Sequence, residues 1–93
     1  MKSILQDEKR CYICGTTETL QEHHCFPGKN RKTSEENGFK VWLCLDHHTG
    51  SNYSAHGKDG KTLALMLKKH CQTEFEKTHT REEFIRLIGR NYL

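Results

Sequence analysis

The spacing of cysteine and histidine residues is the feature that most constrains this chain. Cys11 and Cys14 form a C-x-x-C pair, and Cys44 and His47 form a C-x-x-H pair further along. Structural zinc sites are commonly built from two such pairs, each supplying two of the four tetrahedral ligands. The spacing therefore predicts a Cys3His site for structural zinc, with enough chain between its halves for a hairpin. The alternative is a set of unrelated buried or free thiols.

A metal staple also suits the composition of the chain. Only 33% of its 93 residues are hydrophobic, and they include four Phe and one Trp. A core of this size rarely stabilises so short a chain alone, so we expect zinc or disulfides to supplement it. The five cysteines are an odd number, which argues against a complete disulfide framework.

Neither a secretory signal nor a membrane-spanning stretch is recognisable in the sequence. Residues 1–10 have no apolar run and no cleavage-site pattern, and no stretch is apolar enough to span a bilayer. We therefore expect a cytoplasmic protein with no membrane partner, in a reducing compartment where C-x-x-C is typical of a metal site. The formal charge of +3 mildly favours a polyanionic partner.

The hydrophobic pattern predicts two strands. Residues 20–26 have the length of a strand and end at Pro27-Gly28, a strong stop signal. Residues 39–44 alternate with the period of a strand. We expect the two to pair as a hairpin around residues 28–37, a basic and polar stretch that we predict to be a loop.

Two helices are predicted after the strands. From Lys61, hydrophobic residues recur at helical spacing, and Thr80 and Glu83 form the capping box of a second helix. The sequence thus predicts an α+β fold, with a flexible leader over residues 1–10 and a single domain over residues 11–93 that includes two C-terminal helices. The buried stripes are expected to be Leu63, Leu67, Cys71 and Phe75 in the first helix, and Phe84, Leu87, Ile88 and Tyr92 in the second.

Three histidines remain near the motifs once Cys44 and His47 are assigned to zinc. His23 and His24 are neighbours on the first predicted strand, and His48 directly follows His47. Because neutral imidazole is a common metal ligand, this surplus indicates a second metal site. His48 could instead replace His47 as the fourth zinc ligand.

The arrangement resembles the HNH nucleases, the ββα-metal group. Many members carry C-x-x-C, a strand ending in Asp-His or His-His, a long loop and then C-x-x-C-H. The stretch 27–31 and the ending 82–93 resemble short HNH proteins of phages and prophages and the RecA-dependent nuclease branch. The resemblance covers roughly residues 11–93 and implies a zinc-stapled, treble-clef-like ββα-metal domain. The matching residues here are Cys11 and Cys14, Glu22-His23-His24, and Cys44 to His48, with His47 in place of the usual last cysteine.

Carried over position by position, the resemblance implies roles for the histidines. His24 matches the general base that takes a proton from the attacking water. His23 and His48 match ligands of the catalytic metal. His56 is expected to be a third ligand or a phosphate contact.

The resemblance also implies an asparagine that braces the loop orienting the base. Asn30 and Asn37 are both candidates, and we prefer Asn30 because it lies within the matching stretch 27–31. Arg31 or Lys29 could hold the phosphate, since an arginine side chain matches phosphate oxygens in a bidentate manner.

The function implied by the resemblance is metal-dependent hydrolysis of DNA phosphodiester bonds. The expected cofactors are structural Zn²⁺ and a catalytic Mg²⁺, Mn²⁺, Zn²⁺ or Ni²⁺. The expected setting is a bacterial cytoplasm, in a phage- or prophage-encoded protein whose partner could be a recombinase filament or another phage protein. The alternative is a non-catalytic zinc module that contacts nucleic acid or protein. Residues 28–37 lack the aromatic side chains with which such a module would stack bases.

Overall fold

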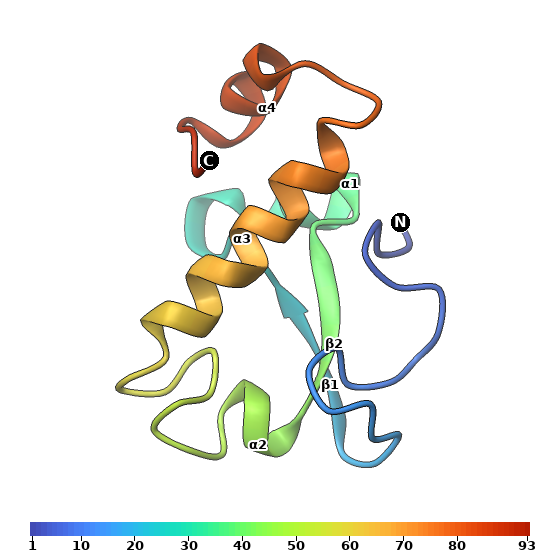
Figure 1. Ribbon diagram of the computed structural model, residues 1–93, viewed down its shortest axis with the longest axis vertical. Helices are drawn as coiled ribbons and strands as arrows, with labels where there is room; N and C mark the ends of the chain where they lie inside the picture. The colour runs from blue at the N-terminus through green and yellow to red at the C-terminus, as the bar shows by residue number, and fades with distance from the viewer.

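The two predicted strands pair with each other, which confirms the expected hairpin (Figure 1). The computed structural model describes residues 1–93 and contains one two-stranded antiparallel sheet. Helices lie between the two strands and after the second one, so the fold is α+β as expected. The elements in chain order are β1 (Leu20–His24), η1 (Gly28–Asn30), α1 (Arg31–Asn37), β2 (Lys40–Cys44), α2 (Leu45–His48), α3 (Lys61–Phe75) and α4 (Arg81–Ile88).

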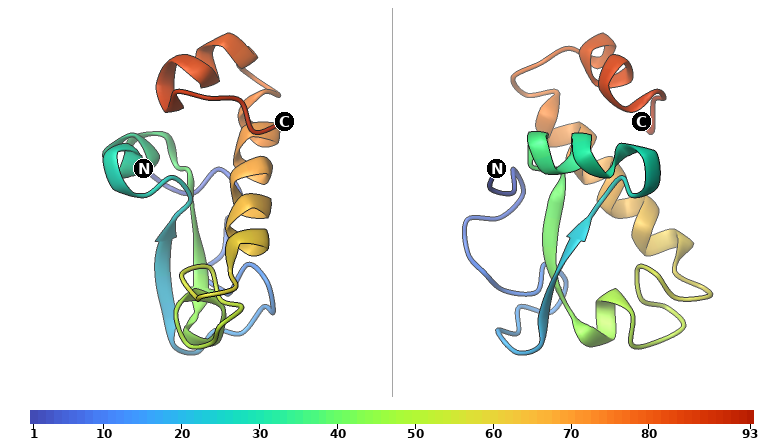
Figure 2. Two further views of the ribbon diagram at one scale, coloured as in Figure 1. Left: turned by 90° about the vertical axis from the view of Figure 1, so that its left-hand side faces the viewer. Right: turned by 180° about the vertical axis from the view of Figure 1, so that it is seen from behind.

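The register of the hairpin separates its residues into two faces. His23 lies opposite Val41, and His24 lies opposite Lys40. Because successive side chains of a strand point to opposite sides, His23 shares a face with Val41 and His24 shares the other face with Lys40. Figure 2 shows α3 running along one side of the hairpin, so the molecule has a sheet layer and a helix layer.

The buried residues of α3 and α4 confirm most of the predicted stripes. In α3, Leu67, Cys71 and Phe75 are buried, and Leu63 packs against the core at its edge. In α4, Phe84 and Ile88 are buried, and the predicted capping box of Thr80 and Glu83 is present. The prediction was wrong for Leu87, whose side chain is 37% exposed. Phe84 and Ile88 are four residues apart and face the core together, whereas Leu87 lies at the border of that face.

The segment between the strands is helical, so the predicted loop over residues 28–37 is wrong. Helix α1 buries only Ser34, so the sequence offers no hydrophobic stripe by which to recognise it. The Ser34 hydroxyl accepts a hydrogen bond from Phe26 N at 3.2 Å and donates one to Phe26 O at 2.9 Å. Gly38 ends the helix in the left-handed conformation, with φ of 72°. These contacts fix α1 across the end of β1.

Residues 1–10, expected to be a flexible leader, form no helix or strand but contact the domain. Ile4 N donates to Gly38 O at 3.0 Å, and Trp42 N donates to the Gln6 side chain at 2.7 Å. Ile4 and Leu5 also pack against the hydrophobic core. The segment therefore follows the outer edge of β2.

None of the helices combines the length and the hydrophobicity that crossing a bilayer requires.

Candidate metal centres and the cleft between them

The four residues predicted to bind structural zinc converge at one end of the hairpin. The ligand atoms of Cys11, Cys14, Cys44 and His47 all lie within 4.8 Å of one another. His47 Nδ1 lies 3.1 Å from Cys44 Sγ and 3.6 Å from Cys11 Sγ. The group is positioned to hold a metal ion, and three thiols with one imidazole are compatible with zinc. His47, rather than His48, completes the group.

Backbone hydrogen bonds build this Cys3His group from two separate segments. Tyr12 N donates to Trp42 O at 2.8 Å and joins the first cysteine pair to β2. The turn after Cys11 closes through Gly15, whose φ of 78° suits glycine. Helix α2 begins directly after Cys44, so His47 comes back toward the thiols within one turn.

The electrostatic surroundings of Cys11 favour its thiolate. Burial acts to raise the pKa of the Cys11 thiol, but backbone hydrogen bonds from Cys14 and Cys44 outweigh burial and lower it from 9.0 to about 6. A thiolate is the form that binds a metal ion. The favoured thiolate is that of Cys11 alone, because burial raises the pKa of the Cys44 thiol in the same group.

A second group brings together His23, His48 and His56. Their ligand atoms also lie within 4.8 Å of one another. The ring centroids are 5.3 Å apart for His23 and His48, 5.0 Å for His23 and His56, and 4.8 Å for His48 and His56. The three come from β1, the end of α2 and the following turn, where His56 N donates to His48 O at 2.9 Å. We call these residues the three-histidine group.

The chemistry of this group fits a cation. His23 is only 2% exposed, and its Nε2 is a buried polar atom with no hydrogen-bond partner. A buried polar atom without a partner is costly, and a bound cation would satisfy it. Burial, together with the nearby His56, lowers the pKa of His23 to about 3. Burial and His56 also lower the pKa of His48. Both imidazoles are therefore neutral at pH 7, as metal ligands must be.

A glutamine side chain orients one member of the three-histidine group. His48 Nδ1 lies 2.7 Å from the Oε1 atom of Gln21. Because that oxygen can only accept, His48 carries its proton on Nδ1 and leaves Nε2 free for a ligand. Such contacts behind a ligating histidine fix both its tautomer and its ring orientation.

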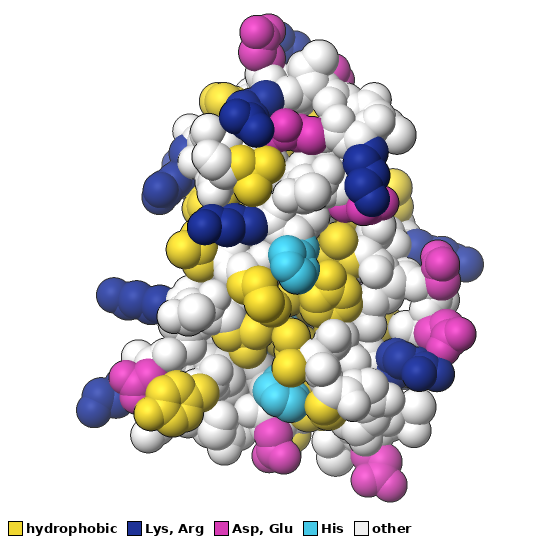
Figure 3. All heavy atoms as spheres, in the orientation of Figure 1, with side chains coloured by type: hydrophobic (Ala, Val, Ile, Leu, Met, Phe, Trp, Pro, Cys, Tyr) yellow, Lys and Arg dark blue, Asp and Glu magenta, His cyan; other side chains and the backbone are white.

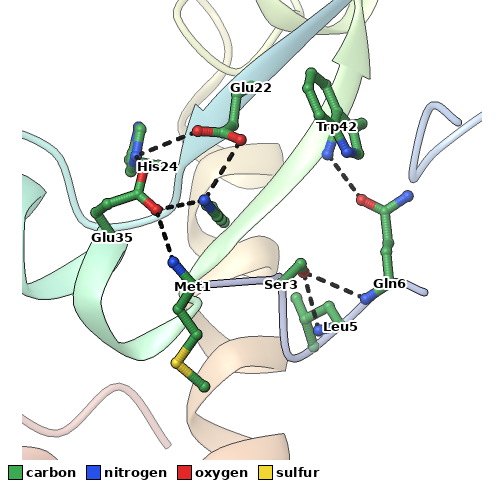
Figure 4. A network of polar contacts seen from close by, with 9 residues as sticks. Met1, Ser3, Leu5, Gln6, Glu22, His24, Glu35 and Trp42 are labelled. Atoms are coloured by element: carbon green, nitrogen blue, oxygen red, sulfur yellow. Dashed lines mark hydrogen bonds and ion pairs between the residues drawn. The ribbon is translucent and has the colours of Figure 1, made fainter. Parts of the chain in front are cut away.

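His24 lines a cleft together with His48 and His56. Strand β1 is regular through His24, so His23 and His24 face opposite sides of the hairpin, and His23 itself does not line this cleft. The cleft has a volume of about 230 Å³. The His24 side chain is 9% exposed, and its Nε2 lies 3.1 Å from Glu35 and 3.7 Å from Glu22 (Figure 4). The lining residues are Glu22, His24, Pro27, Arg31, His48 and His56.

The asparagine that was expected to brace the loop of the base does not line the cleft. Asn30 Nδ2 donates to Ile88 O at 3.0 Å, which ties η1 to α4, and Asn30 does not line the cleft. Asn37 donates within α1, to Thr33 O at 2.9 Å. The structure therefore brings Arg31 to the cleft and leaves both asparagines outside it. A bracing role for Asn30 would act through α4.

Sequence reasoning missed three residues next to the histidines. Gln21 lies two positions before His23 and so shares its face, which the strand period alone could have indicated. Lys40 lies opposite His24, which the pairing of the predicted strands could have indicated. Glu35 gave no signal, because the stretch that carries it was predicted to be a loop.

Basic side chains are spread over the surface rather than gathered in one patch. On the face shown in Figure 3, hydrophobic side chains gather in the middle, and Lys and Arg side chains lie around the margins, on the left, at the top and on the right. Lys29, Arg31 and Lys32 are exposed on η1 and α1. Arg31 is the basic residue that reaches the cleft.

The cleft therefore lies beside three imidazoles that could hold a cation, and it is lined by a further histidine, His24, and by Arg31, which can bind an anion. Comparisons with models of known protein families, with curated proteins and with solved structures found no match.

Proposed function

We propose that this protein is a metal-dependent DNA endonuclease of the HNH type, with a treble-clef-like ββα-metal domain stapled by structural zinc. The observation that carries the proposal is the convergence of His23, His48 and His56, two of which, His48 and His56, line one cleft together with His24. The order of a hairpin followed by a short helix, with a Cys3His group at its base, also supports the HNH resemblance.

The residues of the cleft suit hydrolysis of a phosphodiester. A divalent cation held by His23, His48 and His56 would supply positive charge that stabilises the phosphate and the departing oxygen. His24 takes a proton from the attacking water, for which an imidazole is well suited near neutral pH. Arg31 binds the phosphate through its guanidinium group. The small size of the protein leaves room for a partner, such as a recombinase filament, to present the DNA.

The second candidate is a zinc-stapled module that binds nucleic acid or protein without cleaving. Such a module needs the Cys3His group but gives no reason for His23 to be buried with an unpartnered nitrogen. It also gives no reason for three further imidazoles to converge. These two features favour the nuclease.

A plasmid-nicking assay tests the proposal. Supercoiled DNA is incubated with the wild type, His24→Ala and His70→Ala in a series of Mg²⁺, Mn²⁺, Zn²⁺ and Ni²⁺. His70 is an exposed histidine on α3 that does not line the cleft, so its variant is the matched control. We expect the wild type and His70→Ala to nick alike with at least one metal. His24→Ala is expected to nick about 10²- to 10⁴-fold more slowly, as is usual on loss of a general base.

Two results would redirect the proposal. If the wild type cuts no DNA with any of the metals, alone or with a recombinase filament, the binding module becomes the better account. If His24→Ala cuts as fast as the wild type, the nuclease can stand but His24 is not its base.

A further inference from the structure

A carboxylate outside the HNH motif contacts the candidate base. Glu35 lies on α1, on the side of the hairpin that carries His24 (Figure 4). Its Oε1 atom lies 3.1 Å from His24 Nε2, closer than the 3.7 Å that separates Nε2 from Glu22. Helix α1 is held across the end of β1 by the paired hydrogen bonds of Ser34 and Phe26, so Glu35 approaches from a fixed element.

The charge of Glu35 is fixed by its neighbours. The ammonium group of Lys40 forms an ion pair with Glu35, and it also lies 3.4 Å from Glu22. The hydrogen bond from Lys40, followed by the one from His24, lowers the pKa of Glu35 to about 2. At neutral pH this carboxylate is therefore ionised and can only accept hydrogen bonds.

The protonation of His24 follows from this contact. An imidazole that faces an acceptor through Nε2 must carry its proton there, and a neutral ring then has its lone pair on Nδ1. A general base needs one defined atom aimed at the water it deprotonates. A ring without such a partner divides its proton between the two nitrogens and can rotate.

We propose that Glu35 is a positioning residue of the nuclease, which accepts a hydrogen bond from His24 Nε2–H and so makes Nδ1 the proton-accepting atom. Lys40 holds the Glu35 carboxylate in place. The proposal rests on the function proposed above and deepens it. It adds an acidic residue on α1 to the catalytic arrangement, with no direct contact to DNA or metal.

The test compares Glu35→Ala with Glu36→Ala. Both variants remove one negative charge from α1, but Glu36 is exposed and is not among the residues around His24. Nicking rates at several DNA concentrations give kcat and KM, and thermal melting reports the fold. Long-range nitrogen–proton NMR of the imidazoles reports which nitrogen of His24 carries the proton, whether or not the protein cuts DNA.

We expect Glu35→Ala to lower kcat roughly 10- to 100-fold at unchanged KM and unchanged melting temperature, because the base loses the acceptor that orients it. The NMR spectrum should show the Nε2–H form in the wild type and in Glu36→Ala, and a mixture of both forms in Glu35→Ala. Equal kcat in the two variants, or an Nδ1–H form in the wild type, would overturn the proposal.

A wild type that fails to nick any DNA would defeat the proposed function, and the NMR result would then decide the role of Glu35 alone. If the Nε2–H form depends on Glu35, the orienting contact stands without the nuclease. If the tautomer is the same with and without Glu35, the positioning proposal is wrong as well.

Discussion

The Cys3His group and the three-histidine group, which are the two metal groups that the sequence predicted, differ in how completely the chain surrounds the ion. Glu22, His24 and Glu35 form a third group whose ligand atoms are close enough to hold a metal ion, but the sequence did not predict it. The Cys3His group offers four ligands, which complete a tetrahedral site. The three-histidine group offers three imidazole ligands, and two of them, His48 and His56, line a cleft together with His24 and Arg31. Structural zinc sites are closed, whereas catalytic metal sites keep an open position. Under the function proposed above, the Cys3His group would serve stability and the three-histidine group would serve chemistry.

A single short helix connects the two groups. His47 and His48 are neighbours on α2, yet His47 joins the cysteines and His48 joins the other histidines. Successive residues of a helix point about 100° apart, so one turn can supply both groups. Correct folding of the Cys3His end therefore also places His48.

The largest expected effect separates the groups by their contribution to folding. Cys11→Ser removes a ligand from the closed site, where metal binding in small zinc domains supplies on the order of 10 kcal/mol of folding free energy. We expect loss of one bound metal equivalent and of the cooperative thermal transition, measured by metal analysis and circular dichroism.

The matched control for Cys11→Ser is Cys25→Ala. Cys25 is equally buried but belongs to neither metal group. Its variant should keep the metal and lose only about 1 kcal/mol of stability, which is typical of a single substitution. If Cys11→Ser melts at the same temperature as Cys25→Ala, the Cys3His group has no structural role.

The second expected effect concerns the three-histidine group, whose site is open to the cleft. His48→Ala should abolish nicking and lose the cation of the three-histidine group, while the Cys3His group keeps its metal. Because His48 is only half-buried, the melting temperature should change little compared with that of Cys11→Ser. Metal analysis and melting of the same preparation check both statements. Equal destabilisation by the two substitutions would mean that the groups are not functionally distinct.

The ligands of the Cys3His group could be predicted from the sequence, because each pair of ligands lies within four consecutive residues. Two C-x-x-C/H pairs identify Cys11, Cys14, Cys44 and His47 without any knowledge of the fold. The strands, α3 and the capping box of α4 were also predictable, since each has a period or a cap that short windows contain. The same reasoning missed α1, because a helix that buries only Ser34 has no hydrophobic period.

The open site was predictable only in part, because its residues come together through the tertiary structure. His23 and His48 could be chosen from the HNH resemblance, but the contact of His48 with Gln21 depends on how α2 lies beside β1. The contact of His24 with Glu35 depends on the unpredicted α1. Asn30 was selected by position in a motif, and the structure directs its side chain to α4 instead.

The third expected effect concerns the residue behind a metal ligand. Gln21→Ala removes the acceptor that fixes the His48 tautomer, so metal affinity at the three-histidine group should fall about 10- to 100-fold. Gln21→Glu keeps an acceptor in the same place and should retain the affinity. Calorimetric titration of both variants, with the Cys3His group already loaded, measures the difference. Equal affinities would show that His48 needs no orientation.

The smallest expected effect is the pH dependence that the buried His23 adds to folding. Its pKa is about 3 in the folded chain and 6.5 ordinarily, because burial, then His56, disfavours its charged form. Between these pH values the unfolded chain binds a proton that the folded chain excludes, so stability is full above pH 6.5 and falls as the pH falls toward 3.

His23→Leu removes this proton uptake. Without metal at the three-histidine group, the wild type should lose about 1 kcal/mol more than His23→Leu between pH 7 and pH 5.5. Urea unfolding of both proteins at the two pH values gives this difference directly, and effects of the Cys3His group cancel in the comparison. A difference near zero would mean that His23 is charged or solvated in the folded protein, and the open site would then lack its buried neutral ligand.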